Sequence, residues 1–248
     1  MRLLLINPNT TPAITALLER HAGRLAGAAV EIRAVTGRFG ARYIASRAAS
    51  AVAGHAALDA FAEHGEGCDA VLLACFGDPG LLALRELSPV PVVGMAEAAC
   101  HLACLQGARF SIVTGGERWG PMLHEFVASL GLTSRLASIR TVAPTGAEIA
   151  RDPAGAISLL AAVSAECVAV DGAEVVILGG AGLAGLAGRI APDVPAPVLC
   201  SLEAGIMATI AAPGLGLGLA KAGAGSLAAT PPVETIGLSP DLARRFAG

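Results

Sequence analysis

Aromatic and charged residues are both scarce in this chain of 248 residues. Phe, Trp and Tyr together make up 3% of the sequence, and Asp, Glu, Lys and Arg make up 15%. The low aromatic content argues against a binder of single-stranded nucleic acid, because such proteins stack bases on aromatic rings. The net charge is −3 and no run of basic residues is present. The chain therefore lacks the positive stripe that neutralises phosphates, and we expect no nucleic-acid partner.

Long uninterrupted apolar runs are also absent, although 54% of the residues are hydrophobic. The most apolar stretch, residues 205–220, is broken by Pro213 and by several glycines, and Lys221 follows it. A membrane-spanning helix needs about 20 nearly continuous apolar residues, so we expect no membrane span. The apolar N-terminal segment 3–6 is too short for a secretory signal peptide.

The six cysteines are spaced neither as a disulfide framework nor as a zinc site. The chain is long enough to build its own core without covalent cross-links. Cys100 and Cys104 are four residues apart in a helical stretch, a spacing that suits zinc only with further ligands. The five histidines share no metal-binding spacing. We therefore expect a cytoplasmic protein with free thiols and no metal site.

Short apolar segments alternate with helix-forming segments along the chain, which is the pattern of βα units and a mainly parallel sheet. The expected strands cover residues 3–6, 30–35, 70–74, 90–93, 110–113, 137–141, 175–178 and 198–199. The expected helices cover residues 11–25, 46–63, 121–130, 154–170 and 201–211, and a short helix is expected to start within 239–241. No chemistry is assigned to the Gly-, Ala- and Pro-rich region that begins at Pro213.

The two halves of the chain resemble each other. The apolar segment that ends at Cys75 aligns with the one that ends at Gly180, and the segment VPVV at 90–93 aligns with APVL at 196–199. This internal duplication predicts an α/β fold of two pseudo-symmetric Rossmann-like domains, with mainly parallel sheets that face a central cleft. Ligands of open α/β sheets bind at the carboxyl ends of the strands, so we expect the site in that cleft.

Cys75 is the residue most suited to chemistry. It ends an apolar strand, and the next residues are expected to open a helix with Asp78 as its cap and Pro79 as its first residue. A thiol beside a helix N-terminus is expected to ionise readily, because the helix dipole and free amides favour the thiolate. Such a thiolate is a nucleophile or a base toward a carbon acid. The alternative is a buried cysteine that serves only as a small apolar side chain.

Polar groups follow other expected strands. Asn7 begins the segment NPNTT at 7–11, whose amides and hydroxyls can bind a carboxylate or an imide; the alternative is an ordinary turn and helix cap. In the second half, Thr114 and Gly115 begin a glycine-containing turn whose backbone amides suit an anion, or which is a turn and nothing more.

Charged side chains also have two interpretations. Arg38, Arg42 and Arg47 are candidates to hold an anionic substrate, and the alternative is that they are solvated surface charges. Glu97 and Glu203 fall in the first turns of expected helices, where the helix dipole stabilises a carboxylate that has no catalytic role.

Four segments together resemble the hydantoin racemase branch of the aspartate/glutamate racemase superfamily. They are INPNT at 6–10, CFGDPGL at 75–81, VGMAEA at 93–98 and TGGERW at 114–119. The resemblance covers about residues 1–212, and its CFGDPG segment is quite specific. It implies two pseudo-symmetric α/β domains, no cofactor and a homo-oligomer. It also implies a discontinuous first domain, 1–96 plus 204–248, and a second domain at 97–203.

The resemblance further implies a cofactor-independent racemase or epimerase that acts at the α-carbon of a small carboxylate, amino-acid derivative or hydantoin, with Cys75 as acid/base. In this family one thiolate removes the α-proton and an opposite thiol returns a proton on the other face. The second cysteine is expected at Gly180, which has no side chain to give or take a proton. Cys200, at the end of the last strand, is a candidate substitute thiol, and the alternative is a buried, inert cysteine.

Removing a proton next to a carbonyl requires preorganised donors for the enolate oxygen, each worth about 2.7–4 kcal/mol in comparable oxyanion sites. The candidate donors lie at strand ends: Asn7, Thr114, Gly115 and the backbone amides of Phe76, Gly180 and Ala181. Two other functions stay open. One is a single-cysteine decarboxylase of the arylmalonate type, or an isomerase, and the other is a non-catalytic protein that binds a small carboxylate or imide.

Overall fold

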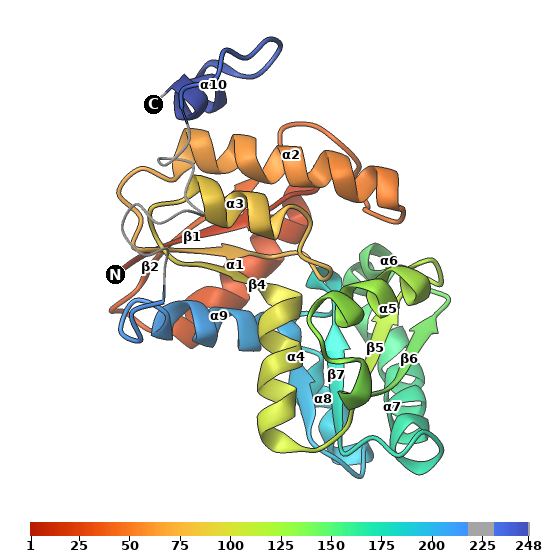
Figure 1. Ribbon diagram of the computed structural model, residues 1–248. Helices are drawn as coiled ribbons and strands as arrows, with labels where there is room; N and C mark the ends of the chain where they lie inside the picture. The colour runs from red at the N-terminus through yellow and green to blue at the C-terminus, as the bar shows by residue number, and fades with distance from the viewer. Residues whose placement is uncertain (218–230, 248) are drawn as a thin grey trace.

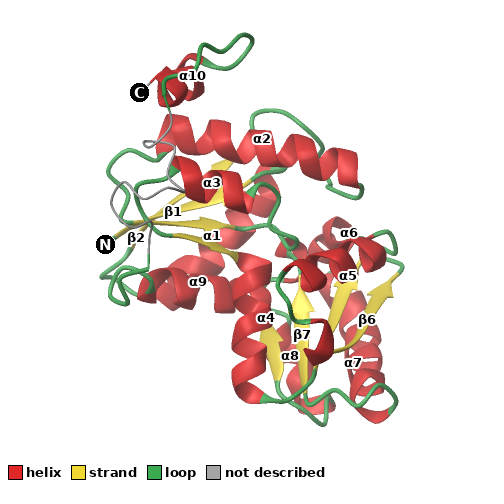
Figure 2. Ribbon diagram, viewed as in Figure 1, coloured by secondary structure: helices red, strands yellow, loops and turns green. Residues whose placement is uncertain are grey.

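The computed structural model describes residues 1–217 and 231–247 and contains two four-stranded parallel sheets with helices packed on them (Figure 1; Figure 2). The first sheet has the strand order β2-β1-β3-β4 and the second has the order β6-β5-β7-β8. The second order repeats the first, because β5 to β8 take the places of β1 to β4. The predicted α/β fold with two similar halves is confirmed.

The eight strands of these two sheets lie within two residues of their predicted positions. They are β1 (Arg2–Asn7), β2 (Glu31–Thr36), β3 (Ala70–Leu73), β4 (Val92–Gly94), β5 (Phe110–Gly115), β6 (Leu136–Val142), β7 (Val175–Gly179) and β8 (Val198–Cys200). In the register of the central pairs, Leu5 of β1 lies opposite Leu72 of β3, and Ile112 of β5 lies opposite Ile177 of β7. The strands β3 and β7 are buried along their whole length, which explains their continuous apolar sequences.

The helices cover both sheets. Those of the first half, with the helix that returns to it, are α1 (Pro12–Ala26), α2 (Arg47–His64), α3 (Leu81–Leu87), α4 (Met95–Gln106) and α9 (Ser201–Ala211). The second half carries α5 (Trp119–Ser129), α6 (Gly146–Arg151), α7 (Pro153–Ala169) and α8 (Ala187–Ile190), with the 3-10 turns η1 (Thr133–Arg135), η2 (Ala181–Leu183) and η3 (Ala191–Asp193). The sequence did not predict α6 or α8, which are short. No helix in the described ranges is both long and apolar enough to cross a membrane.

Helix α4 lies at the junction of the two halves. It packs on α9 and also contacts β7 of the second sheet, as Figure 1 shows. Helix α9 in turn contacts β3 of the first sheet. The chain therefore returns to the first half through α9, while domain boundaries at 96/97 and 203/204 stay a prediction.

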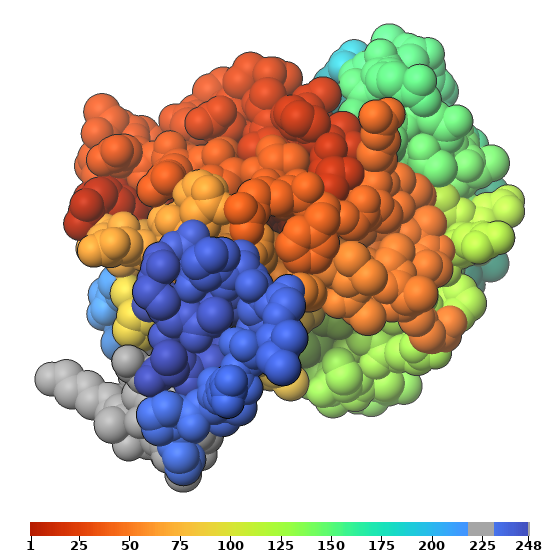
Figure 3. Space-filling view, turned by 90° about the horizontal axis from the view of Figure 1, so that it is seen from above, coloured from red at the N-terminus to blue at the C-terminus, as the bar shows by residue number. Residues whose placement is uncertain are grey.

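The first sheet has a core on each face. Leu3 and Leu5 of β1 belong to the core shared with α1 and α9, whereas Leu4 and Ile6 belong to the core shared with α2 and α3. This division follows from the two-residue period of a strand. The last helix, α10 (Pro240–Ala247), packs on α2 and adds Leu242 to the second of these cores (Figure 3).

The turn between β3 and α3 approaches α2 closely at two glycines. Gly80 has a φ of +78°, and a Cβ at this position would lie 2.7 Å from the Cα of Gly54 in α2. Because the obstructing atom belongs to the backbone, no side-chain rotation relieves the contact. The glycine at position 80 therefore holds the turn that carries Cys75 against α2.

We expect Gly80→Ala to lower the free energy of unfolding by about 1–3 kcal/mol, because the added methyl group overpacks this contact. The control is Gly23→Ala in α1, where a new Cβ would have no atom within 4 Å. The free energy of unfolding of this variant should rise by about 0.5–1 kcal/mol, because alanine is a better helix former than glycine. Urea unfolding followed by circular dichroism measures both, and equal stabilities of the two variants would contradict the account.

Candidate active site

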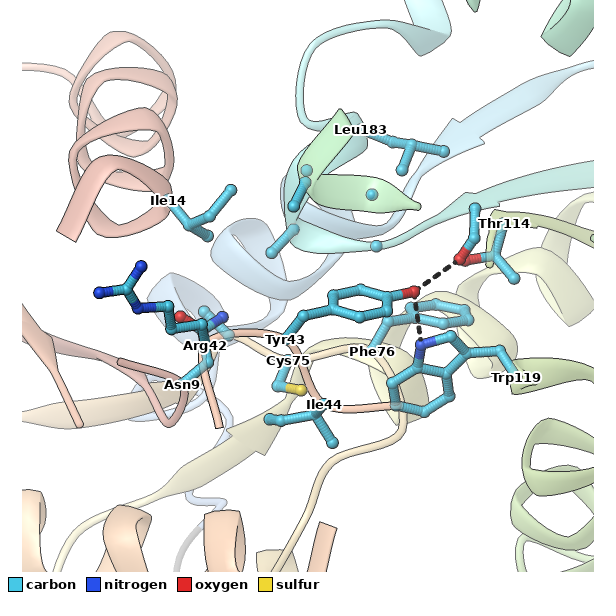
Figure 4. Close-up of a pocket in the computed structure, with 17 residues that line it drawn as sticks. Asn9, Ile14, Arg42, Tyr43, Ile44, Cys75, Phe76, Thr114, Trp119 and Leu183 are labelled. Atoms are coloured by element: carbon cyan, nitrogen blue, oxygen red, sulfur yellow. Dashed lines mark hydrogen bonds between the residues drawn. The ribbon is translucent and has the colours of Figure 1, made fainter. Parts of the chain in front are cut away.

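A cavity of about 60 Å³ lies where the carboxyl ends of the two sheets meet (Figure 4). Its walls come from strand ends and adjoining loops of both halves: Asn9, Ile14, Arg42, Tyr43, Ile44, Ala74, Cys75, Phe76, Thr114, Gly115, Trp119, Gly146, Ala147, Gly180, Ala181, Gly182 and Leu183. The cavity has room for about four water molecules, which is the space of a small ring. The predicted cleft between the halves is confirmed.

Cys75 follows β3 and lines the cavity, with 8% of the residue exposed. Burial raises the pKa of the Cys75 thiol well above its usual range, and the nearby Asp78 carboxylate raises it further. The expected helix N-terminus does not counter this effect, because α3 begins only at Leu81 and has Gly80 as its N-cap. The prediction of an easily ionised thiol is therefore wrong, because its surroundings favour the neutral thiol.

Asp78 caps a different helix from the one predicted. Its carboxylate accepts hydrogen bonds from the backbone amides of Ala96, at 2.9 Å, and Glu97, at 2.7 Å, in the first turn of α4. Its φ of +45° is unusual for a residue other than glycine. Burial raises the pKa of Asp78 to about 7, although both amide bonds favour the carboxylate. Asp78 therefore ties the turn that carries Cys75 to the helix at the junction of the halves.

Asn7 organises the loop after β1 and does not line the cavity. Its Nδ2 donates to Asn9 Oδ1 at 3.1 Å and to Thr15 Oγ1 at 3.0 Å, and its Oδ1 accepts the Asn9 amide at 3.3 Å. The residue is completely buried. Asn9, the second asparagine of the same segment, does line the cavity. The structure thus places Asn9, and not the predicted Asn7, where a ligand can reach it.

Gly180 follows β7 as Cys75 follows β3, and both line the cavity. Its φ is +134°, and a Cβ there would lie 3.3 Å from Leu183 Cδ1 and 3.6 Å from Thr114 Oγ1. The Gly180 amide donates to Ser201 Oγ at 3.2 Å. The prediction that this amide holds a substrate oxygen is therefore not supported, because the amide already has a partner.

Other predicted donors do face the cavity. Thr114 is 4% exposed, and within residues 1–217 and 231–247 its hydroxyl has no hydrogen-bond partner. Phe76 and Ala181 line the cavity, and Ala181 begins η2, so its amide has no partner within that helix. Gly115 lines the cavity, but its carbonyl oxygen is engaged by Tyr43. Cys200 is buried, is not part of the lining, and has a pKa raised by burial.

Two aromatic residues that the sequence analysis did not single out form a wall of the cavity. Tyr43 lies in the loop between β2 and α2, and its hydroxyl donates to the Gly115 carbonyl oxygen at 3.0 Å (Figure 4). Trp119 Nε1 donates to the Tyr43 hydroxyl at 3.1 Å. Burial raises the pKa of Tyr43, which keeps it a neutral phenol. The sequence feature that could have pointed to these two residues is their rarity, since they are the sole tyrosine and the sole tryptophan of the chain.

The arginine candidates separate into two roles. Arg38 pairs with the buried Asp59, and Arg47 pairs with Glu125 on the surface, so both are engaged by carboxylates of the protein. Arg42 has an exposed side chain and lies in the wall of the cavity, where it can meet a ligand. Across the described residues, no group of three or more His, Cys, Asp or Glu side chains is arranged to hold a metal ion.

The raised pKa of Asp78 predicts a specific dependence of stability on pH. The folded chain retains a proton that the unfolded chain releases above its pKa of about 3.9. This contribution to the free energy of unfolding is therefore complete below pH 3.9 and is lost as the pH rises through about 7. The titratable or charged groups near Asp78 are Cys75, Arg85, Glu97 and Cys100.

We expect Asp78→Asn to remove this loss of stability at higher pH. The side-chain amide of asparagine does not ionise, and its oxygen can still accept a hydrogen bond from α4. The difference in unfolding free energy, variant minus natural chain, should increase from pH 4 to pH 7. Denaturant unfolding at several pH values measures it. A difference that stays constant over this range would show that Asp78 is ionised throughout.

Comparison with known proteins gives the family. Residues 3–209 match the sequence model of the Asp/Glu/hydantoin racemase family. The chain is 36% identical over 207 residues to a hydantoin racemase of Pseudomonas sp. (strain NS671), covering 83% of each chain. It is 37% identical over 206 residues to a hydantoin racemase of Paenarthrobacter aurescens, covering 82% of this chain and 87% of that one.

A solved structure agrees with these sequence matches. The crystal structure of an allantoin racemase from Pseudomonas fluorescens superposes with a TM-score of 0.89 at 33% identity, covering 96% of this chain and 100% of that one. An allantoin racemase from Klebsiella pneumoniae superposes with a TM-score of 0.83 at 30% identity, covering 98% and 93% of the two chains. The chain therefore belongs to the Asp/Glu/hydantoin racemase family.

Proposed function

We propose that the protein is a cofactor-independent racemase-like enzyme that moves the proton on the ring α-carbon of a hydantoin, with Cys75 as its acid/base. The observation that carries this proposal is the position of Cys75, which lies at a strand end and borders the cavity between the halves. The relatives named hydantoin and allantoin racemases support the substrate class. The cavity volume supports a small ring.

The chemistry needs a base for the α-proton and donors for the enolate oxygen. The Cys75 thiolate removes the proton, and the electron pair of the broken C–H bond moves into the carbonyl. Thr114, Phe76 and Ala181 line the cavity, and we expect the Thr114 hydroxyl and the backbone amides of the other two to be these donors. Because burial opposes ionisation of the thiol, the rate should rise with pH across the neutral range.

Gly180 stands where the family resemblance expects the second cysteine, and we propose that this site works with one thiol. Its position at the end of β7, equivalent to that of Cys75 at the end of β3, supports this assignment. A homo-oligomer, which the resemblance also implies, stays a prediction.

Exchange of the α-proton in D₂O tests the proposed reaction. We expect the protein to exchange this proton in at least one enantiomer of 5-methylhydantoin. Cys75→Ser should abolish the exchange in the enantiomer whose α-proton faces the sulfur, since a serine hydroxyl is a far weaker acid than a thiol. The control is Cys200→Ser, another buried cysteine at a strand end but outside the cavity, which should retain the exchange.

Proton NMR follows the loss of the α-proton signal. Exchange that survives Cys75→Ser unchanged in both enantiomers would contradict the role of this thiol. Release of CO₂ from a disubstituted malonate, without exchange on any hydantoin or amino acid, would instead favour the decarboxylase. Binding of a hydantoin without turnover would favour a non-catalytic binding protein.

Adding a thiol at position 180 tests whether the second half still presents the other face of the substrate. Both Gly180→Cys and Gly180→Ala must adopt a φ near +134°, at a cost of about 1–3 kcal/mol in stability. Only the cysteine variant gains an acid/base group, so it should interconvert the enantiomers faster than the alanine variant. Polarimetry measures both rates, and equal rates would contradict the assignment of Gly180.

A further inference from the structure

A site with one thiol needs another group to act on the opposite face of the substrate if it is to invert the α-carbon. Among the described side chains that border the cavity, only two are weak acids of suitable strength, the Cys75 thiol and the Tyr43 phenol. The ordinary pKa values of a thiol and a phenol are about 8.5 and 10, within reach of acid/base chemistry in water. The hydroxyl of Thr114 and the amide of Asn9 are weaker acids still.

The Tyr43 hydroxyl lies on the wall that belongs to the second half. It donates to the Gly115 carbonyl oxygen at the end of β5, and Figure 4 shows the side chain extending toward Thr114 and Trp119. In the register of the second sheet, Thr114 pairs with Gly179 of β7, and Gly180 follows. The strand end that the Tyr43 hydroxyl contacts is therefore next to the strand end that Gly180 follows.

The second half is shaped to receive this hydroxyl. Gly116 has a φ of +92°, and a Cβ there would lie 2.3 Å from the Tyr43 oxygen, so only glycine leaves room for the phenol. The Trp119 indole N–H donates to the same oxygen. This bond holds the phenol in place and favours the phenolate that forms when the proton leaves.

The loop that carries Tyr43 is fixed to the first half at several points. The Gly37 amide donates to the Asn7 carbonyl oxygen at 2.8 Å, and the Thr10 amide donates to the Ala41 carbonyl oxygen at 3.2 Å. The Thr11 hydroxyl donates to the carbonyl oxygen of the residue before Tyr43 at 2.9 Å. Tyr43 is therefore presented by an anchored loop, as an acid with a defined position requires.

From these contacts, and resting on the proposed function, we infer that Tyr43 is the second acid/base of the site and acts on the substrate face opposite Cys75. In one direction the Cys75 thiolate takes the α-proton and the C–H electron pair forms the enolate. The Tyr43 O–H then turns from the Gly115 carbonyl oxygen to the substrate and protonates the other face. This step leaves a thiol and a phenolate. In the other direction the phenolate takes the proton and the thiol returns one, and exchange with water resets the site.

Tyr43→Phe separates the two faces experimentally. Each enantiomer of 5-methylhydantoin is incubated in D₂O, with exchange followed by proton NMR and inversion by circular dichroism. We expect inversion to fall about 10²–10⁴-fold, the usual contribution of a general acid or base, while exchange with retention at the Cys75 face stays within about tenfold. Retained exchange also shows that the variant has folded and binds the substrate.

Three outcomes decide between the proposals. Inversion at the rate of the natural chain would overturn the role of Tyr43. Equal losses of exchange and inversion, in a variant that unfolds at the natural temperature, would also overturn it, because they indicate a residue that only shapes the cavity. If the natural chain itself shows neither exchange nor inversion, the proposed function fails, and not the assignment of Tyr43 alone.

A second experiment uses the fact that Tyr43 is the only tyrosine. Protein made with 3,5-difluorotyrosine in place of tyrosine changes at this one position, and the fluorines make the phenol more acidic while keeping its ring. The charged or titratable groups around the phenol are Arg42, Cys75 and Glu148, and all of them stay unchanged. We expect the pH profile of inversion in the direction that uses the phenolate as base to move to lower pH. A profile that does not move would overturn the proposal.

Discussion

The close contact between the two halves is possible because glycines occupy the positions where they meet. A Cβ at Gly179 would lie 2.4 Å from the Phe76 ring, and one at Gly77 would lie 2.8 Å from the Trp119 ring. Side chains at these positions would hold the two sheets apart. The glycines instead bring the strand ends together around a cavity of about 60 Å³. Among the described residues that line it, Cys75 and Tyr43 carry the weakly acidic side chains, and this limits the possible chemistry.

Burial of the site makes ionisation of its two acidic side chains costly. The pKa values of Cys75 and Tyr43 are both raised by burial, which favours the neutral thiol and the neutral phenol. A racemase of this kind must therefore form a base before it can remove a proton. The donors for the enolate oxygen offset this cost only once a substrate is bound, because the negative charge then spreads from one sulfur atom onto a hydrogen-bonded oxygen.

The fold could be predicted from local patterns, because alternating apolar strands and helices repeat in the two halves and need no knowledge of distant contacts. The same patterns placed Cys75 at a strand end. They did not show that Asp78 caps α4 or that Tyr43 meets Trp119, since these partners are far apart in the sequence and meet only in the folded chain. The choice between Asn7 and Asn9 depended on side-chain directions within one turn, which residue spacing does not determine.

A crystal structure with 5-methylhydantoin bound tests the central claim most directly. The account predicts that the ring α-carbon lies between the two halves, with the Cys75 sulfur on one face and the Tyr43 oxygen on the other, each about 3–3.5 Å away, as proton transfer requires. A ring bound with both groups on the same face, or with its α-carbon out of reach of the sulfur, would contradict it.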